Sequence, residues 1–452
     1  MKTFIKNLLV IAVLLITAFA VGCVNDDDEP QVEDKDVVWV SIFGSSSDPF
    51  FSVTAVPGGV VAAGYSTASS FGEGDWTGVT GKGDDDAIIV KFDQSGNVIW
   101  KKSFGGANYD RFWSVAAVSD GVIATGYSRE LGTGDWTGVT AKGSRDAIMV
   151  KYDLNGNMVW KKNFGGRNSD EFSSITALSD GFVTAGYTSS IGHGDWIDLR
   201  DGGSAAIVKF DHDGNAVWKK NFGGWNKDWF LSVAADNDGL IAVGYSDQYS
   251  FGHYDWLGVT GKGAIDAIIV KYDHSGNLMW KKHFGGSGDD CFNSVTALSD
   301  GYIAVGYSGF KSFNTGDWDG VANKSRSGDD AIIVKYDLNG NLVWKKNFGG
   351  AYDDCFQSII AVSDGIVAAG KSRVNASDNA GDWSDMKGSD NAEAILVKYD
   401  TQGNVLWKKH RGFGYAISYS VSAVADGLVA TGTSHNNVKG VYGATVVKYR
   451  VK

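Results

Sequence analysis

A single repeated motif constrains the fold of this chain more than any other feature. Trp followed by Lys-Lys occurs six times, and a degenerate first copy lies near the start of the repeat region. The anchors are Trp39, Trp100, Trp160, Trp218, Trp280, Trp344 and Trp407, spaced 58 to 64 residues apart. The same four segments surround each anchor in the same order. A period of this length indicates a repeat protein whose units pack against their neighbours.

One complete unit, Phe112 to Phe164, shows what each repeat contains. Its four β-rich segments are 112–118, 122–127, 146–152 and 158–162. They are rich in β-branched and aromatic residues, and Gly and Asp in the turns separate the first pair and the last pair. None has helical periodicity. Four antiparallel strands in each of several repeats predict a β-propeller.

The two ends of the repeat region are expected to complete one another. The chain enters the repeat at 37–39, which corresponds to a fourth strand, and leaves it at 446–449, which corresponds to a third strand. An open ring would leave two largely apolar blade faces in water. We therefore predict an all-β, seven-bladed propeller spanning 37–452, closed by the N-terminal strand joining the last blade.

The first residues are typical of an export signal. Lys2 and Lys6 precede an apolar run at 8–21, which is shorter than the roughly 20 apolar residues that a membrane span needs. The run ends Ala-Val-Gly before Cys23, and this segment resembles the lipobox of bacterial lipoproteins. The resemblance implies cleavage after residue 22 and a diacylglycerol on the Cys23 thiol, which would anchor the protein to a membrane. The alternative is an ordinary cleaved signal with a chance Cys.

An acidic run follows, and we expect residues 23–36 to form a solvated tether. The run at 25–29 also resembles the acidic export signal that sends some Bacteroidetes-type lipoproteins to the outer face of the outer membrane. The expected location is therefore extracytoplasmic, at the cell surface.

The repeat itself resembles a known family. The run from Asp330 to Asp337, with Gly340-Asn341, Trp344 and 348–350, resembles the bacterial β-propeller repeat of secreted and surface proteins. That resemblance covers nearly everything after residue 36 and implies the fold, but the family has no shared catalytic motif. The Asp-x-x-Gly-Asn-x-x-Trp portion also looks like an Asp-box or a quinoprotein repeat. Quinoprotein dehydrogenases use eight blades and dedicated ligands, so we expect no cofactor here.

Residues repeated in every blade are expected to serve the scaffold. The turn carboxylates Asp93, Asp153, Asp211, Asp273, Asp337 and Asp400 each precede Gly-Asn and can cap their own turns. Calcium binding is the alternative, although the later Glu ligand of calcium loops is absent. Lys101 and Lys102, with their equivalents, should protect the exposed outer strands from pairing with another chain; the alternative is an anion-binding stripe.

Long loops between the second and third strands carry a repeated Gly-Asp-Trp. Their tryptophans are Trp76, Trp136, Trp196, Trp256, Trp318 and Trp383. We expect each to pack against the next blade. The alternative is an exposed aromatic ring that binds a glycan or a protein.

A third repeated set precedes the innermost strand: Asp48, Asp110, Asp170, Asp228, Asp290 and Asp354. In a propeller these carboxylates should ring one mouth of the central channel. Asp110, Asp170, Asp228, Asp290 and Asp354 are then weak candidates for a cation site. The alternative is that each accepts hydrogen bonds from the amides of its own turn.

Residues that the repeat does not explain are the candidates for function. Thirteen of the 16 Trp belong to the two repeated motifs, which leaves Trp113, Trp225 and Trp229. With Arg111, His193 and His253 they form a predicted ligand-binding patch on the loop-rich face. The alternative is local packing under the loops.

Two cysteines also depart from the repeat. Cys291 and Cys355 occupy equivalent positions in adjacent blades. A disulfide would require a close approach of neighbouring inner strands, so we expect two reduced, partly buried thiols.

Charge and composition narrow the function classes. The net charge of −12 argues against nucleic-acid binding. We predict a non-catalytic platform that binds protein or glycan. The alternatives are a polysaccharide-processing enzyme using Asp110, Asp170 and Asp228, and a surface spacer without a ligand.

Overall fold

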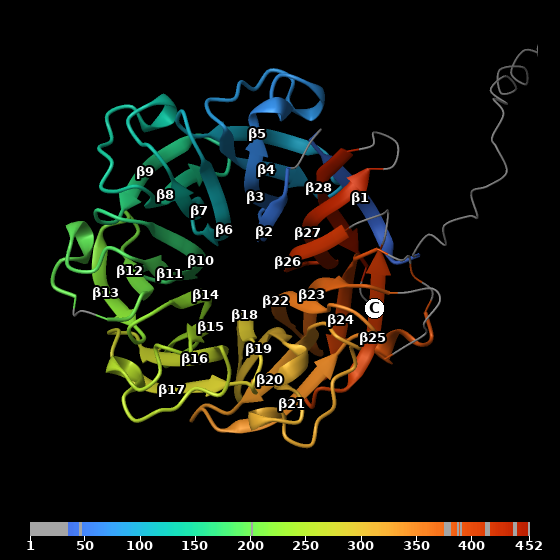
Figure 1. Cartoon of the computed structure of the whole chain (residues 1–452). Helices are drawn as coiled ribbons and strands as arrows, with labels where there is room; N and C mark the ends of the chain where they lie inside the picture. The colour runs from blue at the N-terminus through green and yellow to red at the C-terminus, as the bar shows by residue number, and fades with distance from the viewer. Residues whose placement is uncertain are drawn as a thin grey trace, which may run out of the picture.

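The chain folds into a ring of seven four-stranded antiparallel sheets (Figure 1). The computed structural model describes residues 35–44, 48–199, 202–374, 381–386, 388, 391–411, 416–436 and 441–450. The leader 1–22, the lipidation candidate Cys23 and the tether up to residue 34 lie outside the described residues. The prediction of a seven-bladed all-β propeller is confirmed.

Each blade contributes one strand to each of four concentric layers. The innermost strands are β2 (Phe50–Val56), β6 (Asp110–Val118), β10 (Asp170–Leu178), β14 (Asp228–Ala235), β18 (Asp290–Leu298), β22 (Cys355–Val362) and β26 (Ala416–Val424). The second strands are β3 (Gly59–Thr67), β7 (Gly121–Ser128), β11 (Gly181–Thr188), β15 (Gly239–Asp247), β19 (Gly301–Ser308), β23 (Gly365–Ser372) and β27 (Gly427–Asn436). The third strands are β4 (Asp85–Asp93), β8 (Asp146–Asp153), β12 (Ala205–Phe210), β16 (Ile265–Asp273), β20 (Asp330–Tyr336), β24 (Glu393–Tyr399) and β28 (Val441–Tyr449). The outer strands are β5 (Val98–Phe104), β9 (Met158–Phe164), β13 (Ala216–Phe222), β17 (Leu278–Phe284), β21 (Leu342–Phe348), β25 (Val405–Arg411) and β1 (Val37–Phe43).

The ring closes through the N-terminal strand, as the sequence predicts. β1 pairs antiparallel with β28 and completes blade 7, whose order is β1-β28-β27-β26. The side chain of Phe43, at the end of β1, packs edge-on against Trp76 of blade 1 at 4.9 Å between ring centroids. The Gly44 amide donates to the Asp75 carboxylate of the same loop at 3.0 Å. The first and last repeats are thus joined by the same contacts that join the other blades.

The anchor tryptophans of the repeats, apart from Trp407 of blade 6, pack on the turn between the third and fourth strands of the following blade. Trp100 donates its indole N–H to the Leu154 carbonyl at 3.1 Å and lies against Gly156, whose φ of 81° closes that turn. The Asp153 carboxylate accepts the amides of Asn155 and Asn157, and these hydrogen bonds lower its pKa. The same pattern recurs in the other repeats, which confirms the predicted turn-capping role.

Each Gly-Asp-Trp segment forms a short 3₁₀ turn that clamps two blades together. These turns are η2 (Gly74–Trp76), η3 (Gly134–Trp136), η4 (Gly194–Trp196), η5 (Tyr254–Trp256), η7 (Gly316–Trp318) and η8 (Gly381–Trp383). In η3 the Trp136 ring meets Phe104 edge-on at 4.8 Å, and the Asp135 carboxylate accepts the Gly105 amide at 3.0 Å. Both contacts lie on the preceding blade, so the prediction of packing against the next blade is wrong. The six tryptophans are at most 2% exposed, which excludes the alternative of an exposed aromatic ring.

The first Lys of the repeated pair fastens this loop rather than guarding the strand edge. Lys101 donates to the Asp75 carbonyl and, at 3.2 Å, to the Thr77 carbonyl. Lys102 is exposed, as expected. The prediction of edge protection is therefore wrong for Lys101, because the long loop folds back over the outer strand and offers it carbonyl oxygens.

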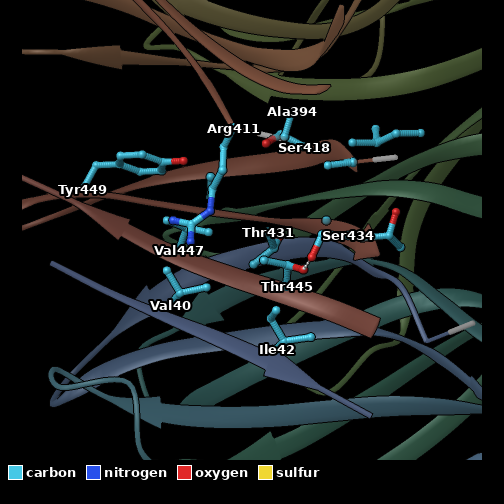
Figure 2. A pocket seen from close by; sticks show the side chains of 15 residues that line it. Val40, Ile42, Ala394, Arg411, Ser418, Thr431, Ser434, Thr445, Val447 and Tyr449 are labelled. Atoms are coloured by element: carbon cyan, nitrogen blue, oxygen red, sulfur yellow. Dashed lines mark hydrogen bonds between the residues drawn. The ribbon is translucent and has the colours of Figure 1, made fainter. Parts of the chain in front are cut away.

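The junction between blades 6 and 7 lacks the aromatic packing of the others. Arg411 stands where other outer strands end in Phe, and Ser418 replaces the Phe of the other inner strands. A small cavity of about 20 Å³ lies there, lined by Val40, Thr431 and other blade-7 residues together with Arg411 (Figure 2). This volume is enough for about one water molecule.

Candidate functional site

The repeated carboxylates before the inner strands are buried within the blades. Asp110 has no exposed surface; it accepts the Gly106 amide at 2.7 Å and the Trp136 indole N–H at 2.8 Å. Burial raises its pKa to about 6, and the same holds for Asp228 and Asp290. Asp170 and Asp354 are likewise fully buried and bonded to their own loops.

The alternative that each of these carboxylates accepts an amide of its own turn is therefore confirmed, and their placement around the channel mouth is wrong. Burial removes the reason to expect a cation site at Asp110, Asp170, Asp228, Asp290 and Asp354. It also removes the reason to expect catalysis by Asp110, Asp170 and Asp228. Each carboxylate accepts at least one backbone amide of its own loop. Within the described residues no group of three or more His, Cys, Asp or Glu side chains is placed to hold a metal ion.

The central channel is lined by a ring of seven equivalent serines, which we call the serine ring. Its members are Ser52, Ser114, Ser174, Ser232, Ser294, Ser358 and Ser420. Each hydroxyl accepts a backbone amide of the next blade; Ser52, for example, accepts the Val115 amide at 3.1 Å. The bond from the Val53 amide to Ser420 carries the ring across the junction of blades 7 and 1. The serine ring thus fixes the spacing of the inner strands.

The serine ring belongs to the wall of a cavity of about 350 Å³, and the residue before each serine differs from blade to blade. On one side lies an aromatic arc made of Tyr419, Phe51 and Trp113, from blades 7, 1 and 2. The Phe51 ring lies 4.8 Å from Tyr419 and 4.6 Å from Trp113. Trp113, predicted for the loop face, lines this cavity instead.

Trp229 also lines the cavity, from blade 4. Its ring stacks on Tyr187 at 4.9 Å, and its indole N–H donates to the Ser173 hydroxyl at 2.8 Å. Asn293 and Gln357 complete the polar part of the wall. Trp113 and Trp229 thus share a cavity, although the loop-face patch predicted for them is wrong.

Two thiols lie just behind this polar wall. Cys291 and Cys355 are free and buried, as predicted. Asn293 lies between them, accepting the Cys291 thiol and donating to the Cys355 sulfur at 3.2 Å. Burial raises the pKa of Cys355 to about 12, so this thiol stays protonated and unreactive at neutral pH.

Ion pairs neutralise the charges near the cavity. Glu171, which lines it, is buried and accepts a hydrogen bond from Arg145 at 2.8 Å; burial raises the pKa of Glu171. Arg111 pairs with Asp85 and lies over the Tyr65 ring at 4.0 Å. Both partners belong to blade 1, so Arg111 of blade 2 is held by the preceding blade and does not join the loop-face patch predicted for it.

The loops of blade 4 carry an exposed aromatic surface. Trp225 is 68% exposed, and its ring stacks on His253 at 3.7 Å and 12°. Asp247 accepts hydrogen bonds from the Asn226 side chain and the Tyr249 amide, which holds the two loops together. We call Trp225, Tyr249, His253, Tyr254 and Leu257 the blade-4 ledge.

The ledge departs from the repeat at several positions. Tyr254 replaces the Gly of Gly-Asp-Trp and keeps a φ of +47°, in the left-handed region where the five glycines also lie. Leu257, 76% exposed, stands where blades 1 and 2 have Thr. Trp225 stands where blades 2, 5 and 6 have Ala or Ser. Blade 3 has Ile197 at the position of Leu257, 56% exposed, so the aromatic residues Trp225 and Tyr254 distinguish blade 4 more clearly than Leu257 does.

The predicted patch is therefore two separate sets. Trp225 and His253 lie together on the ledge, and His193 is exposed in the equivalent loop of blade 3. Sequence reasoning missed Tyr254, Tyr249 and the variable cavity positions. Aligning the repeats would reveal these positions, because each holds a residue that differs from its equivalents in the other blades. A search for surplus Trp, with the Arg and His near them, does not detect a change to Tyr, Asn or Gln.

No protein-family model matches the chain. The regulatory protein FlaEY of Caulobacter vibrioides is 27% identical over 214 residues, which cover 44% of this chain and 22% of that protein. The match spans less than a quarter of that relative.

Two solved structures align over most of the chain. Sqt1 from Chaetomium thermophilum aligns over 92% of this chain and 99% of its own, with a TM-score of 0.46 and 10% identity. Synechocystis apocarotenoid oxygenase aligns over 86% and 87%, with a TM-score of 0.42 and 12% identity. In the described part of the chain, no helix has both the length and the apolar character that a membrane crossing requires.

Proposed function

We propose that this propeller is a non-catalytic recognition platform whose blade-4 ledge binds a protein partner. The observation that carries the proposal is the strained Tyr254. A non-glycine residue at positive φ costs about 1 to 3 kcal/mol, and such strain concentrates at functional sites. Five sister loops keep Gly at this position, so the scaffold does not need a tyrosine there.

The composition of the ledge favours protein over glycan. Leu257 is 76% exposed and Trp225 68% exposed, and the Asn226 amide and Asp247 carboxylate beside them are bonded to one another. Exposed Trp and Tyr next to aliphatic side chains are typical of the centre of a protein interface. The similarity of part of the chain to a regulatory protein is consistent with a partner-binding role.

The proposal includes a lipid anchor on Cys23 and an extracytoplasmic location at the cell surface, carried by the lipobox-like segment and the repeat of secreted-protein type. A Cys23→Ser variant should leave the membrane fraction and lose metabolic labelling with a fatty-acid probe. Retention in the membrane with unchanged labelling would contradict the anchor and leave the ledge proposal intact.

Capture from a cell-envelope extract tests the ledge. The wild-type protein, a Trp225→Ala/Tyr254→Gly variant and a Trp113→Ala control are immobilised, and the captured proteins are identified and titrated. We expect one protein to bind wild type and control alike, and the ledge variant at least about tenfold more weakly. Equal affinity for all three would contradict the proposal. Binding of a purified glycan in place of protein would overturn the assigned partner class.

A further inference from the structure

We propose that the central cavity is a second, independent site that binds a neutral polyhydroxylated ring, such as a sugar residue. The site does not depend on the blade-4 ledge. Its volume of about 350 Å³ lies at the lower end of the range for small-molecule pockets. The choice of ligand follows from the wall, which combines an aromatic side, a polar side and little uncompensated charge.

The aromatic arc supplies one flat wall. Tyr419, Phe51 and Trp113 follow one another around the channel, with centroids 4.8 and 4.6 Å apart, and all are half-buried. Fully buried aromatic rings would indicate only that the side chains pack in the core of the blades. These rings are only partly covered because they face the cavity. A ring with C–H groups on one face can pack on this arc and remove apolar surface from water.

The rest of the wall supplies hydrogen-bonding groups of both kinds. The serine-ring hydroxyls accept backbone amides, and within the described residues none of them donates to a protein acceptor. Each therefore has a proton to offer. Glu171 and the Gln357 amide provide acceptors. A ligand with several hydroxyl groups can satisfy donors and acceptors together, whereas a hydrocarbon would leave them unpaired at a cost.

The charge balance excludes a strongly charged ligand. Among the described residues that line the cavity, Glu171 is the one carboxylate, and no Lys, Arg or His lines it. Arg145 pairs with Glu171 at 2.8 Å. A free cation would have to compete with Arg145, and an anion would meet a carboxylate. A neutral ligand meets neither penalty.

Binding of monosaccharides and disaccharides to the full protein tests the proposal. Saturation-transfer NMR and titration would use glucose, galactose, N-acetylglucosamine and cellobiose at millimolar concentrations. We expect saturable binding of at least one, weakened about tenfold by Trp113→Ala and by Gln357→Ala. Trp113→Phe should retain most of the affinity. The matched control is Trp225→Ala, which removes a surface Trp of the same size and should leave sugar binding unchanged.

Two outcomes would overturn the cavity site. One is the absence of binding by every sugar tested. The other is binding that survives Trp113→Ala and Gln357→Ala but is lost in Trp225→Ala, which would move the sugar to the ledge. Thermal unfolding of each variant separates lost binding from lost structure. Since the ledge is tested with protein partners, failure of one proposal leaves the other standing.

Discussion

The Tyr-Asp-Trp loop of blade 4 and the Gly-Asp-Trp loop of blade 2 share a backbone but differ in what they present to solvent. Both place a fully buried Trp, Trp256 and Trp136, edge-on against a Phe of the preceding blade at about 5 Å. Only blade 4 has a tyrosine here; Tyr254 is 44% exposed and occupies a backbone conformation suited to Gly. In this molecule, repeated residues hold the blades together, whereas the departures from the repeat in blade 4 add exposed aromatic side chains.

The largest expected effect of a substitution lies in the shared part of the loop. Trp136→Ala removes a fully buried ring and its hydrogen bond to Asp110, so the free energy of unfolding should fall by about 3 to 5 kcal/mol. Urea unfolding measures the change. Trp225→Ala, a substitution of the same type on the ledge, should alter stability by no more than about 0.5 kcal/mol. If the two substitutions lowered the free energy of unfolding by similar amounts, Trp225 would be part of the packed scaffold and not of an exposed surface.

The buried carboxylates should make stability depend on pH. Burial raises the pKa of Asp110 to about 6, so the folded state binds a proton more readily than the unfolded state between about pH 4 and 6. Stability should therefore decrease as pH rises through 6, by about 1 to 3 kcal/mol for this group. Below about pH 4 the turn carboxylates such as Asp93, with lowered pKa, act in the opposite direction.

The measurement is the thermal unfolding midpoint from pH 4 to pH 8, compared with Asp110→Asn. The variant should show a weaker decline between about pH 4 and 6, where wild-type Asp110 loses its proton, because Asn cannot ionise. An identical pH profile would mean that Asp110 does not titrate in this range.

A smaller effect should appear at the strained residue itself. Tyr254→Gly relieves the positive φ and should raise the free energy of unfolding by about 1 kcal/mol, while partner binding weakens. The matched reverse change is Gly134→Tyr in blade 2. There a Cβ would lie 2.4 Å from the Gly105 carbonyl oxygen, so we expect destabilisation. If Gly134→Tyr raised the free energy of unfolding instead, tyrosine would fit this turn without strain, and Tyr254 would not be a strained residue.

The fold follows from the sequence because its determinants are local and repeated. Strand patterns, turn residues such as Asp153 and the incomplete terminal repeats are all visible in the chain, and they predict seven blades and the closure. The direction in which Trp136 packs is not visible, because it depends on how far the loop swings back over the previous blade. The sequence does suggest that Asp110 accepts an amide of its own turn, but it does not show the bond from Trp136, which lies 26 residues away.

The site was predicted less well than the fold. Three unshared tryptophans were correctly separated from the scaffold, but positions four residues apart, in a loop and on the inner strand after it, lead to different faces. Trp229, on β14, lines the cavity, whereas Trp225, four residues earlier, lies on the ledge. Tyr254 was hidden because its motif differs from Gly-Asp-Trp at the first residue only.

The central claim is tested most directly by reverting the ledge to the residues of the other blades. A variant with Trp225→Ala, Tyr249→Ser, Tyr254→Gly and Leu257→Thr should fold with equal or greater stability than the wild type. The dissociation constant of the envelope protein captured by the wild type is then measured against this variant. We predict weakening of about a hundredfold or more. An unchanged dissociation constant in the folded variant would contradict the claim that departures from the repeat in blade 4 form the binding surface.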